Sequence, residues 1–307
     1  MGTSRHRTGI SRVRQWSAPV FRMAPAAPDQ CPLNETHACP KHMSAKSVYS
    51  PPEGHIMTTT SAQPGSLSRP EQMRFARAAV AAQMKSLPGT LRARLRRVDS
   101  SALARESAPP DSALARDAER FVAEHYTTSL YNHCLRCWYF GDFFAQLEGH
   151  RYDPELLYIS SLFHDIALTR QFRDQRPYAC FAVEGADLAK AWLARNNADD
   201  ALAANVAEVI AAHMDVHVPV GSGAEIETYL LHEAAHLDVA GTRASQVPSS
   251  YTRLVAGRHP RTGFARAFSD AMKYESLQRK ASRAAVLWKV GMAIPINTNP
   301  LDSAAHR

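Results

Sequence analysis

Helical periodicity without any strand pattern is the feature that most constrains the fold of this 307-residue chain. From residue 113 onward, apolar side chains recur every three or four positions, and Gly, Pro, Asn or Asp separates most of the periodic segments. The segments are residues 113–125, 129–147, 154–168, 181–196, 201–214, 224–239, 249–256 and 263–285. The alternation of apolar and polar residues that is typical of a half-buried strand is absent over any useful length. The sequence therefore predicts an all-α fold.

The N-terminal part has a different composition. Residues 1–68 are rich in Pro, Ser, Thr and Arg and show no sustained periodicity, so they cannot bury enough apolar surface to offset the entropy of ordering. We expect a disordered basic tail. Its first 28 residues contain five arginines and no acid, which is the composition of a transit peptide. We favour a translation start further downstream, for example at Met57, over a targeting role.

Three further regions follow the tail. Residues 69–109 are expected to form a basic helical extension, in which Pro88 and Gly89 should break the helix. Residues 110–290 are expected to form the helical domain that carries the functional residues. Residues 291–307 are expected to be a C-terminal tail.

Charge and cysteine content narrow the class of protein. Residues 1–68 hold seven basic and three acidic residues, so +4 of the net charge of +7 belongs to the tail. The remaining +3 is too small to favour a nucleic-acid partner. The five cysteines are odd in number and widely spread, which predicts a reducing, cytoplasmic compartment rather than a disulfide framework. No run of about eighteen apolar residues is present, so no membrane partner is expected.

One apolar segment carries two adjacent ionisable residues. Residues 156–169 read LLYISSLFHDIALT and place His164 next to Asp165. Burying both groups costs several kcal/mol unless each has a partner. A divalent metal ion is a suitable partner for an imidazole beside a carboxylate.

Two other helices show a similar anomaly. His133 lies at helical spacing in an apolar and aromatic face, and Asp238 shares a face with Leu231 near the end of its segment. Taken singly, His133 would be an ordinary core histidine and Asp238 a solvent-facing residue before Gly241. Together with the His-Asp pair they form a series of ionisable residues on three apolar helices, and each of these residues needs a partner. Mixed nitrogen and oxygen donors of this kind would suit hard to borderline ions such as Zn, Fe, Mn or Mg, unlike a soft site built from thiolates.

The order of these residues, a histidine, then His-Asp, then an aspartate on separate helices, resembles the HD-domain superfamily of metal-dependent hydrolases (phosphohydrolases). The segments NHCLRCWYFG, LFHDIALT, FAVEGADLAKAWL and LLHEAAHLDVAG look like the corresponding blocks of the cyanamide hydratase-like HD proteins. The resemblance covers about residues 125–280 and implies an HD-domain helical bundle in which His133, His164, Asp165 and Asp238 hold a divalent metal. Ala167 departs from the pattern, because glycine is common at that position.

The resemblance implies a metal-dependent hydrolase that uses a metal-activated water. The aromatic side chains around His133 favour a small, weakly charged substrate, as for a cyanamide hydratase-like enzyme. The arginines at positions 170, 173 and 176 favour an anion, so a phosphohydrolase acting on a nucleotide or phosphoester is the alternative. A non-catalytic HD-fold binding module is the alternative from another class. An intact four-residue metal set speaks against the binding module.

Several residues are candidates for catalysis. Asp165 is suited to act as a general base as well as a metal ligand. His213 is a candidate for a second metal or for substrate contact, whereas Pro219 makes it doubtful that a helix continues to His217. The resemblance places Glu184 near the metal, although an exposed glutamate at a helix start is the ordinary alternative.

Two arginines, two histidines and a cysteine pair complete the polar residues of interest. Arg136 and Arg170 are the candidates for substrate binding, and each has the ordinary alternative of a paired or solvated arginine. His232 and His236 are interpreted as surface or packing histidines. The Cys134-x-x-Cys137 pair lacks a second cysteine pair and is assigned no function.

Overall fold

A computed structural model describes most of the chain from residue 63 onward. The described ranges are residues 63–95, 107–173, 180–220 and 226–304, and all of them belong to one compact unit, residues 59–307. Their regular structure is entirely helical, which confirms the predicted all-α class. The expected tail lies outside the described residues except for residues 63–68. In the described ranges, no helix has both the length and the hydropathy needed to cross a bilayer.

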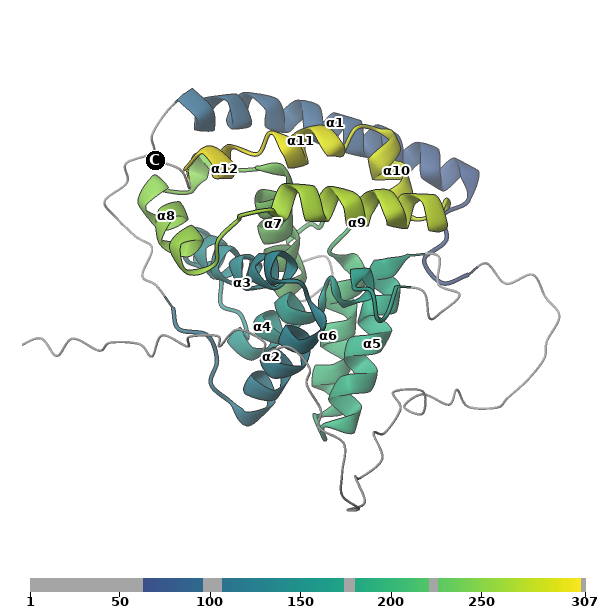
Figure 1. The fold of residues 1–307 in the computed structure, drawn as a ribbon, viewed down its shortest axis with the longest axis vertical. Helices are drawn as coiled ribbons and strands as arrows, with labels where there is room; N and C mark the ends of the chain where they lie inside the picture. Colours follow the sequence, from purple (N-terminus) through teal and green to yellow (C-terminus); the bar gives the residue numbers. More distant parts are fainter. Residues whose placement is uncertain (1–62, 96–106, 174–179, 221–225, 305–307) are drawn as a thin grey trace, which may run out of the picture. The chain divides into compact units, whose positions relative to one another are not determined.

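Helices follow one another along the whole described chain (Figure 1). They are α1 (Arg69–Leu95), α2 (Ala113–His125), α3 (Thr128–Glu148), α4 (Pro154–Phe163), η1 (Ile166–Leu168), α5 (Phe181–Arg195), α6 (Asp200–Ala212), α7 (Ile226–Ala240), η2 (Ala244–Gln246), α8 (Ser249–Arg258), α9 (Phe264–Gln278), α10 (Arg283–Lys289), α11 (Ala293–Asn297) and α12 (Pro300–Ala304).

Helix α3 forms the centre of the core. Nearly every residue from Leu130 to Ala145 is buried, because the helix is apolar or aromatic on all sides rather than along one stripe. It packs against α4, α7 and α9. The Thr127 side chain accepts a hydrogen bond from the Leu130 amide at its start, and Gly149 ends it in the left-handed conformation, φ 73°.

Helix α4 ends earlier than the sequence predicted. The expected helix over residues 154–168 stops at Phe163, and a separate 3-10 turn, η1, begins two residues after His164. Asp165 between them has φ −109° and ψ 10°. Gly185 of α5 lies against this helix end, where an added Cβ would sit 3.4 Å from the carbonyl oxygen of His164. Helix α5 therefore packs directly against the end of α4.

The expected single helix over residues 263–285 was also wrong. Helix α9 ends at Gln278, and α10 begins at Arg283. The Ser282 side chain caps α10 by accepting a hydrogen bond from the Ala285 amide at 3.0 Å. A strong N-cap at this position favours a new helix over continuation of the old one.

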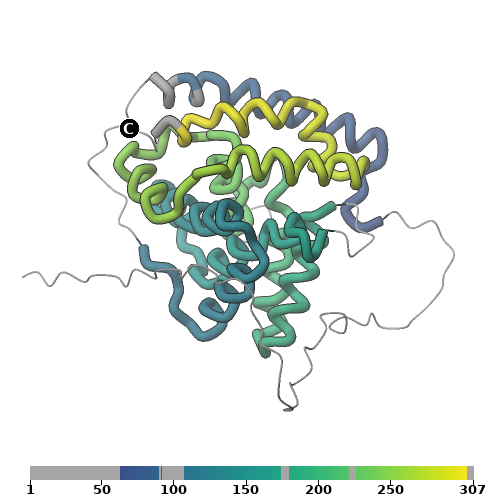
Figure 2. The backbone as a smooth tube through the Cα atoms, viewed as in Figure 1, coloured from purple at the N-terminus to yellow at the C-terminus, as the bar shows by residue number. Residues whose placement is uncertain are grey.

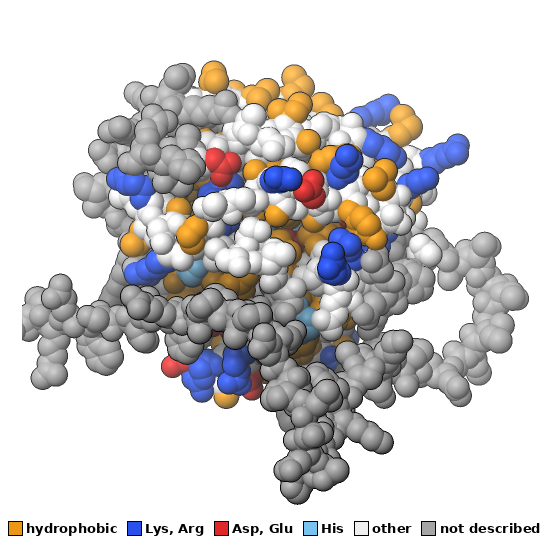
Figure 3. Space-filling model, in the orientation of Figure 1, with side chains coloured by type: hydrophobic (Ala, Val, Ile, Leu, Met, Phe, Trp, Pro, Cys, Tyr) orange, Lys and Arg blue, Asp and Glu red, His pale blue; other side chains and the backbone are white. Residues whose placement is uncertain are grey.

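The predicted break at Pro88 is wrong as well. Helix α1 continues through Pro88 to Leu95. It packs against α10 and η2 (Figure 2), and these tertiary contacts offset the one backbone hydrogen bond that a proline removes. Helix α1 also carries exposed apolar residues, among them Met84 at 66 % and Leu87 at 62 % exposure. Figure 3 shows apolar side chains gathered along the upper edge of the molecule.

The segment predicted as a C-terminal tail contributes α11 and α12. Ile296 of α11 is fully buried, and Leu301 of α12 is 3 % exposed. Helix α11 contacts α7 and α9, whereas α12 contacts α8 and α1. This part of the chain packs on the helices that carry the candidate site.

Candidate metal centre

Two helix ends meet at the centre, and each is followed by a histidine. His164 follows α4 and His213 follows α6, and each is the C-cap residue of its helix. The Nδ1 atom of His164 lies 2.7 Å from the carbonyl oxygen of Ser161, and that of His213 lies 2.6 Å from the carbonyl oxygen of Ile210. Because a carbonyl only accepts, each Nδ1 carries the hydrogen and each Nε2 keeps a free lone pair. The negative ends of both helix dipoles also favour a cation here.

His133 of α3 supplies a third imidazole in the same state. Its Nδ1 donates to Oδ2 of Asp238 at 2.7 Å, and its Nε2 lies 3.2 Å from Nε2 of His164. Two free lone pairs at this distance repel one another unless a proton or a metal ion lies between them. Two nitrogens that bind one zinc ion at about 2.0–2.1 Å in tetrahedral geometry are roughly 3.3 Å apart. The observed separation therefore suits two ligands of one ion.

Asp165 completes the donor set. Its Oδ2 lies 3.5 Å from the Nε2 atoms of both His133 and His164, and its Oδ1 lies 3.9 Å from Nε2 of His213. Oδ2 is buried and has no hydrogen-bond partner among the described residues. Successive side chains within an α-helix diverge by about 100°. Because α4 ends before His164, the adjacent His164 and Asp165 side chains can reach the same point.

Asp238, predicted as a fourth ligand, lies on the Nδ1 side of His133. Arg136 donates to its two oxygens at 2.8 and 2.7 Å, and Arg261 donates to Oδ1 at 2.5 Å. Burial alone would raise the pKa of Asp238, but Arg136, Arg261 and the hydrogen bond from His133 outweigh burial and hold the pKa well below its usual value. The carboxylate is therefore ionised and fixes the orientation of His133.

Burial controls the protonation of the histidines. Burial lowers the pKa of His133, although Asp238 and Asp165 act in the opposite direction. Burial also lowers the pKa of His213 well below its usual value, and the neighbouring His164 adds to the effect. Both imidazoles are neutral near pH 7, which is the form that binds metal ions.

A cavity of about 30 Å³, which we call the inner cavity, borders these residues. This volume holds one or two water-sized groups. Its polar wall is His133, His164, Asp165 and His213, and its other lining residues are Met214, Ala235, His236, Val239, Phe268, Leu287 and Met292. No lysine or arginine is among these lining residues of the described chain.

The remaining predicted site residues lie elsewhere. Arg136 is fully buried against Asp238, and its Nη1 donates to the carbonyl oxygens of residues 259 and 260. Arg170 is exposed and does not line the inner cavity. Glu184 is fully buried and forms an ion pair with Arg279, which also pairs with Glu275 at 3.3 Å. His217 is exposed.

Two residues at the centre were not predicted as site residues: Cys137, to which the sequence analysis assigned no function, and Arg261. Cys137 has its Sγ 3.7 Å from both ring nitrogens of His133, and the donor atoms of Cys137, His133 and His164 all lie within 4.8 Å of one another. Burial raises the pKa of the Cys137 thiol well above its usual value. The signal for Cys137 was its spacing of four from His133 on one helix face. No local pattern indicated Arg261.

Residues 130–240 match the family model of the HD domain. The matched segment is about a third of the chain and contains the histidine of α3, the His-Asp pair and the aspartate of α7. The match supports the HD superfamily for this segment, and that family typically comprises metal-dependent hydrolases. No curated protein matches the sequence. Helix α1 and the helices after residue 240 lie outside the matched segment.

Proposed function

We propose that this protein is a metal-dependent hydrolase or hydratase whose divalent ion is held by His133, His164 and Asp165. The observation that carries the proposal is the hydrogen-bond state of the imidazoles. The Nδ1 atoms of His133, His164 and His213 are all occupied by oxygen acceptors, and their Nε2 atoms lie around the carboxylate of Asp165. Such a site is complete only when a cation shares these donors.

The donor set indicates which ions would suit the centre. Two imidazoles and one carboxylate favour Zn, Fe or Mn, whereas Mg prefers a shell of oxygen ligands. Three protein ligands leave positions open for water and substrate, as in catalytic sites. A bound ion would lower the pKa of water and polarise the electrophilic atom of a substrate.

The chain's own residues would handle the proton. Oδ1 of Asp165 is suited to accept it, and neutral His213 lies 3.9 Å from that oxygen with its Nε2 lone pair free. Asp238 acts through His133, whose ring it orients. Asp165 and His213 are therefore the proposed catalytic residues, whereas Asp238 is a positioning residue.

The surroundings of the inner cavity favour a small, uncharged electrophile, such as the nitrile carbon of cyanamide or of an organic nitrile. Most of the residues that line this cavity outside its polar wall are apolar, among them Phe268, Leu287 and Met292. Phosphoryl transfer develops negative charge that enzymes usually stabilise with arginine or lysine as well as metal. Arg136, the arginine of α3, is already committed to Asp238. We therefore place nitrile hydration ahead of phosphoester hydrolysis.

Metal analysis combined with a substrate screen tests the proposal. The purified protein should contain about one divalent ion per chain, and the screen covers cyanamide, small nitriles, phosphomonoesters and nucleotides with several divalent metals. Asp165→Ala and His164→Ala should lose both metal and turnover. Asp270→Ala, which removes an exposed carboxylate on α9, should change neither.

Three results would contradict the proposal. A protein without metal, or an Asp165→Ala variant with unchanged metal content, would overturn the site. Turnover of phosphoesters without turnover of any nitrile would overturn the substrate class in favour of a phosphohydrolase. A metal-loaded protein that turns over none of these compounds would support a binding module.

A further inference from the structure

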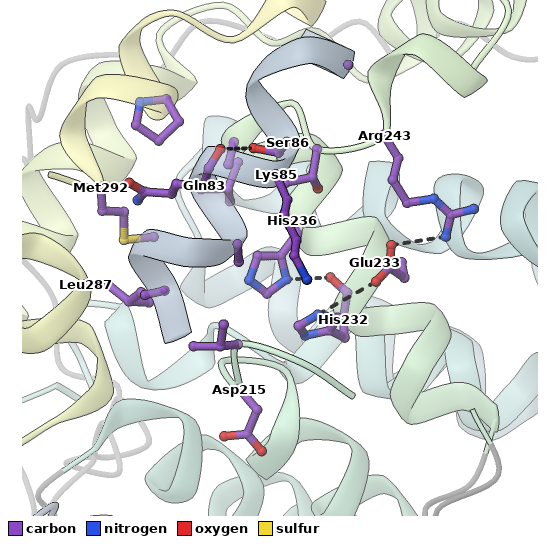
Figure 4. Close-up of a pocket in the computed structure, with 18 of the residues that line it drawn as sticks. Gln83, Lys85, Ser86, Asp215, His232, Glu233, His236, Arg243, Leu287 and Met292 are labelled. Carbon is purple, nitrogen blue, oxygen red and sulfur yellow. Dashed lines mark hydrogen bonds and ion pairs between the residues drawn. The ribbon is translucent and has the colours of Figure 1, made fainter. Parts of the chain in front are cut away.

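A second, larger cavity of about 430 Å³ adjoins the inner cavity, and we call it the outer cavity (Figure 4). Five residues line both cavities and form the partition between them: Met214, His236, Val239, Leu287 and Met292. Two of the five are methionines, whose unbranched side chains adapt to what lies beside them. A ligand in the outer cavity could therefore extend its end toward the metal centre by displacing side chains only.

Helix α1 covers the outer cavity. Ala79, Ala82, Gln83 and Ser86 follow the spacing of one helix face, and all four line the cavity together with Lys85. The opposite wall comes largely from α7 and the segment after it. Helix α1 lies outside the part of the chain that matches the HD domain, so the match says nothing of this wall.

We infer that the outer cavity binds the body of the substrate and that Lys85 binds an anionic group on it, a carboxylate or a phosphate. The inference rests on the proposed function in one respect only, namely that the end of the substrate that reacts lies at the metal centre. The substrate would then carry an uncharged electrophile at one end, a short apolar body and an anionic group at the other end. Cyanamide alone would leave the outer cavity unused.

The charges that line the outer cavity support this assignment. Arg243 donates to Glu233 at 3.0 Å and also pairs with Glu148. Asp215 forms an ion pair with Arg283. Lys85 has no hydrogen-bond or ion-pair partner among the described residues. It is therefore the one lysine or arginine lining this cavity whose charge is not compensated there.

The direction of the side chains is consistent with an anion site at this wall. Figure 4 shows Lys85 extending from α1 toward His236 and His232 of α7. Nδ1 of His236 lies 2.8 Å from the carbonyl oxygen of His232, so its Nε2 is a hydrogen-bond acceptor at the partition. The outer cavity thus offers a cation at the covering helix and an acceptor at the partition.

Binding of paired ligands tests the role of Lys85 without any turnover. Hexanoate, its neutral isostere hexanamide, and hexyl phosphate would be titrated against the metal-loaded full chain by ligand-observed NMR. Because Lys85 is exposed, we expect the anions to bind only roughly two- to fivefold more tightly than the amide. Lys85→Gln should remove this preference and Lys85→Arg should keep it. Lys190→Gln, at an exposed lysine of α5, is the matched control and should behave as the wild type.

Two neighbouring alanines of α1 test the cavity itself. Both alanines are exposed, but only Ala82 lines the outer cavity. Ala82→Trp should weaken all three ligands at least tenfold and leave the metal content unchanged, because the indole occupies the ligand's volume. Ala81→Trp should change neither property.

The results that would overturn the inference are distinct from those that would overturn the metal centre. Equal binding of hexanoate and hexanamide to the wild type, or a preference that survives in Lys85→Gln, would exclude Lys85 as the anion site. The second result would indicate that the anion binds at the metal. Equal effects of the two tryptophan variants would exclude the outer cavity. Loss of metal in any of these variants would show that α1 supports the centre rather than binding substrate. A preference for the phosphate over the carboxylate, or the reverse, identifies which anion the site accepts.

Discussion

The variant Asp238→Asn tests whether Asp238 binds the metal directly or only orients the metal ligand His133. The Asp238 carboxylate is fully buried and accepts hydrogen bonds from His133, Arg136 and Arg261. The amide keeps one acceptor oxygen but no charge, so two guanidinium groups lose their buried counter-ion. Removing one partner of a buried ion pair costs about 3–5 kcal/mol. Because Arg261 keeps a second partner in Asp302, we expect a loss near the lower end of that range.

Metal affinity should fall by a smaller factor than for a lost ligand. Removing the carboxylate that orients a metal-binding histidine typically weakens binding by about 10–100-fold. The free energy of unfolding would be measured by urea titration with the metal chelated, and metal affinity by competition with a chromophoric chelator under native conditions. Asp302→Asn is the matched control, since this carboxylate is 35 % exposed and should contribute less than about 1 kcal/mol.

The opposite pattern would refute the positioning role. If Asp238→Asn unfolds at the same urea concentration as the wild type but no longer binds metal, Asp238 is a direct ligand. In that case the hydrogen bonds to Arg136 and Arg261 would have to be exchanged for the ion when it binds.

Three further predictions follow from buried polar groups. Cys137→Ala should keep a metal affinity within about threefold of the wild type, measured by chelator competition, because Asp165 is the proposed anionic ligand. Loss of metal from this variant would instead identify the Cys137 thiol as a ligand. Burial lowers the pKa of His232 to about 2, so the stability that its neutral form contributes is present above the unfolded-state pKa near 6.5 and is lost as the pH falls below it. His232→Gln should therefore flatten the decline in unfolding free energy between pH 7.5 and 5 by about 2 kcal/mol, and an unchanged slope would contradict the assignment. Glu184→Gln should destabilise the fold by about 2–4 kcal/mol in urea, because it leaves Arg279 short of a buried partner, while metal content stays the same; loss of metal would place Glu184 at the centre.

Most of the helices could be predicted from the sequence because the signals that define a helix, apolar spacing and capping residues, lie within the segment itself. Apolar spacing and capping residues identified the segments that became α2, α3 and α5 with ends within one or two residues. The early end of α4 was missed because the apolar pattern continues through Ile166 to Leu168, which are buried in a 3-10 turn instead. The continuation of α1 through Pro88 depends on contacts with α10 and η2, which no local pattern reports.

In the candidate site, too, some residues follow from local sequence patterns and others only from the tertiary structure. His133, His164 and Asp165 were recognised because each is a polar residue in an apolar helical segment, and the structure brings these three together. The partners of Asp238 and Glu184 could not be read from the sequence. Arg261 lies 23 residues beyond Asp238, and Arg279 lies 95 residues beyond Glu184. A buried carboxylate needs a cation, but the sequence does not say whether that cation is a metal or an arginine.

The hydrogen bond from His164 to the carbonyl oxygen of Ser161 joins two properties that are usually independent. It occupies a carbonyl that the end of α4 leaves without an intrahelical partner, and it also decides which imidazole nitrogen remains free. Substitutions along α4 can preserve both, provided that the residues remain apolar. The insertion or deletion of one residue cannot, since it would turn the end of the helix by about 100° relative to α3. The centre therefore constrains the length of α4 more strictly than its sequence.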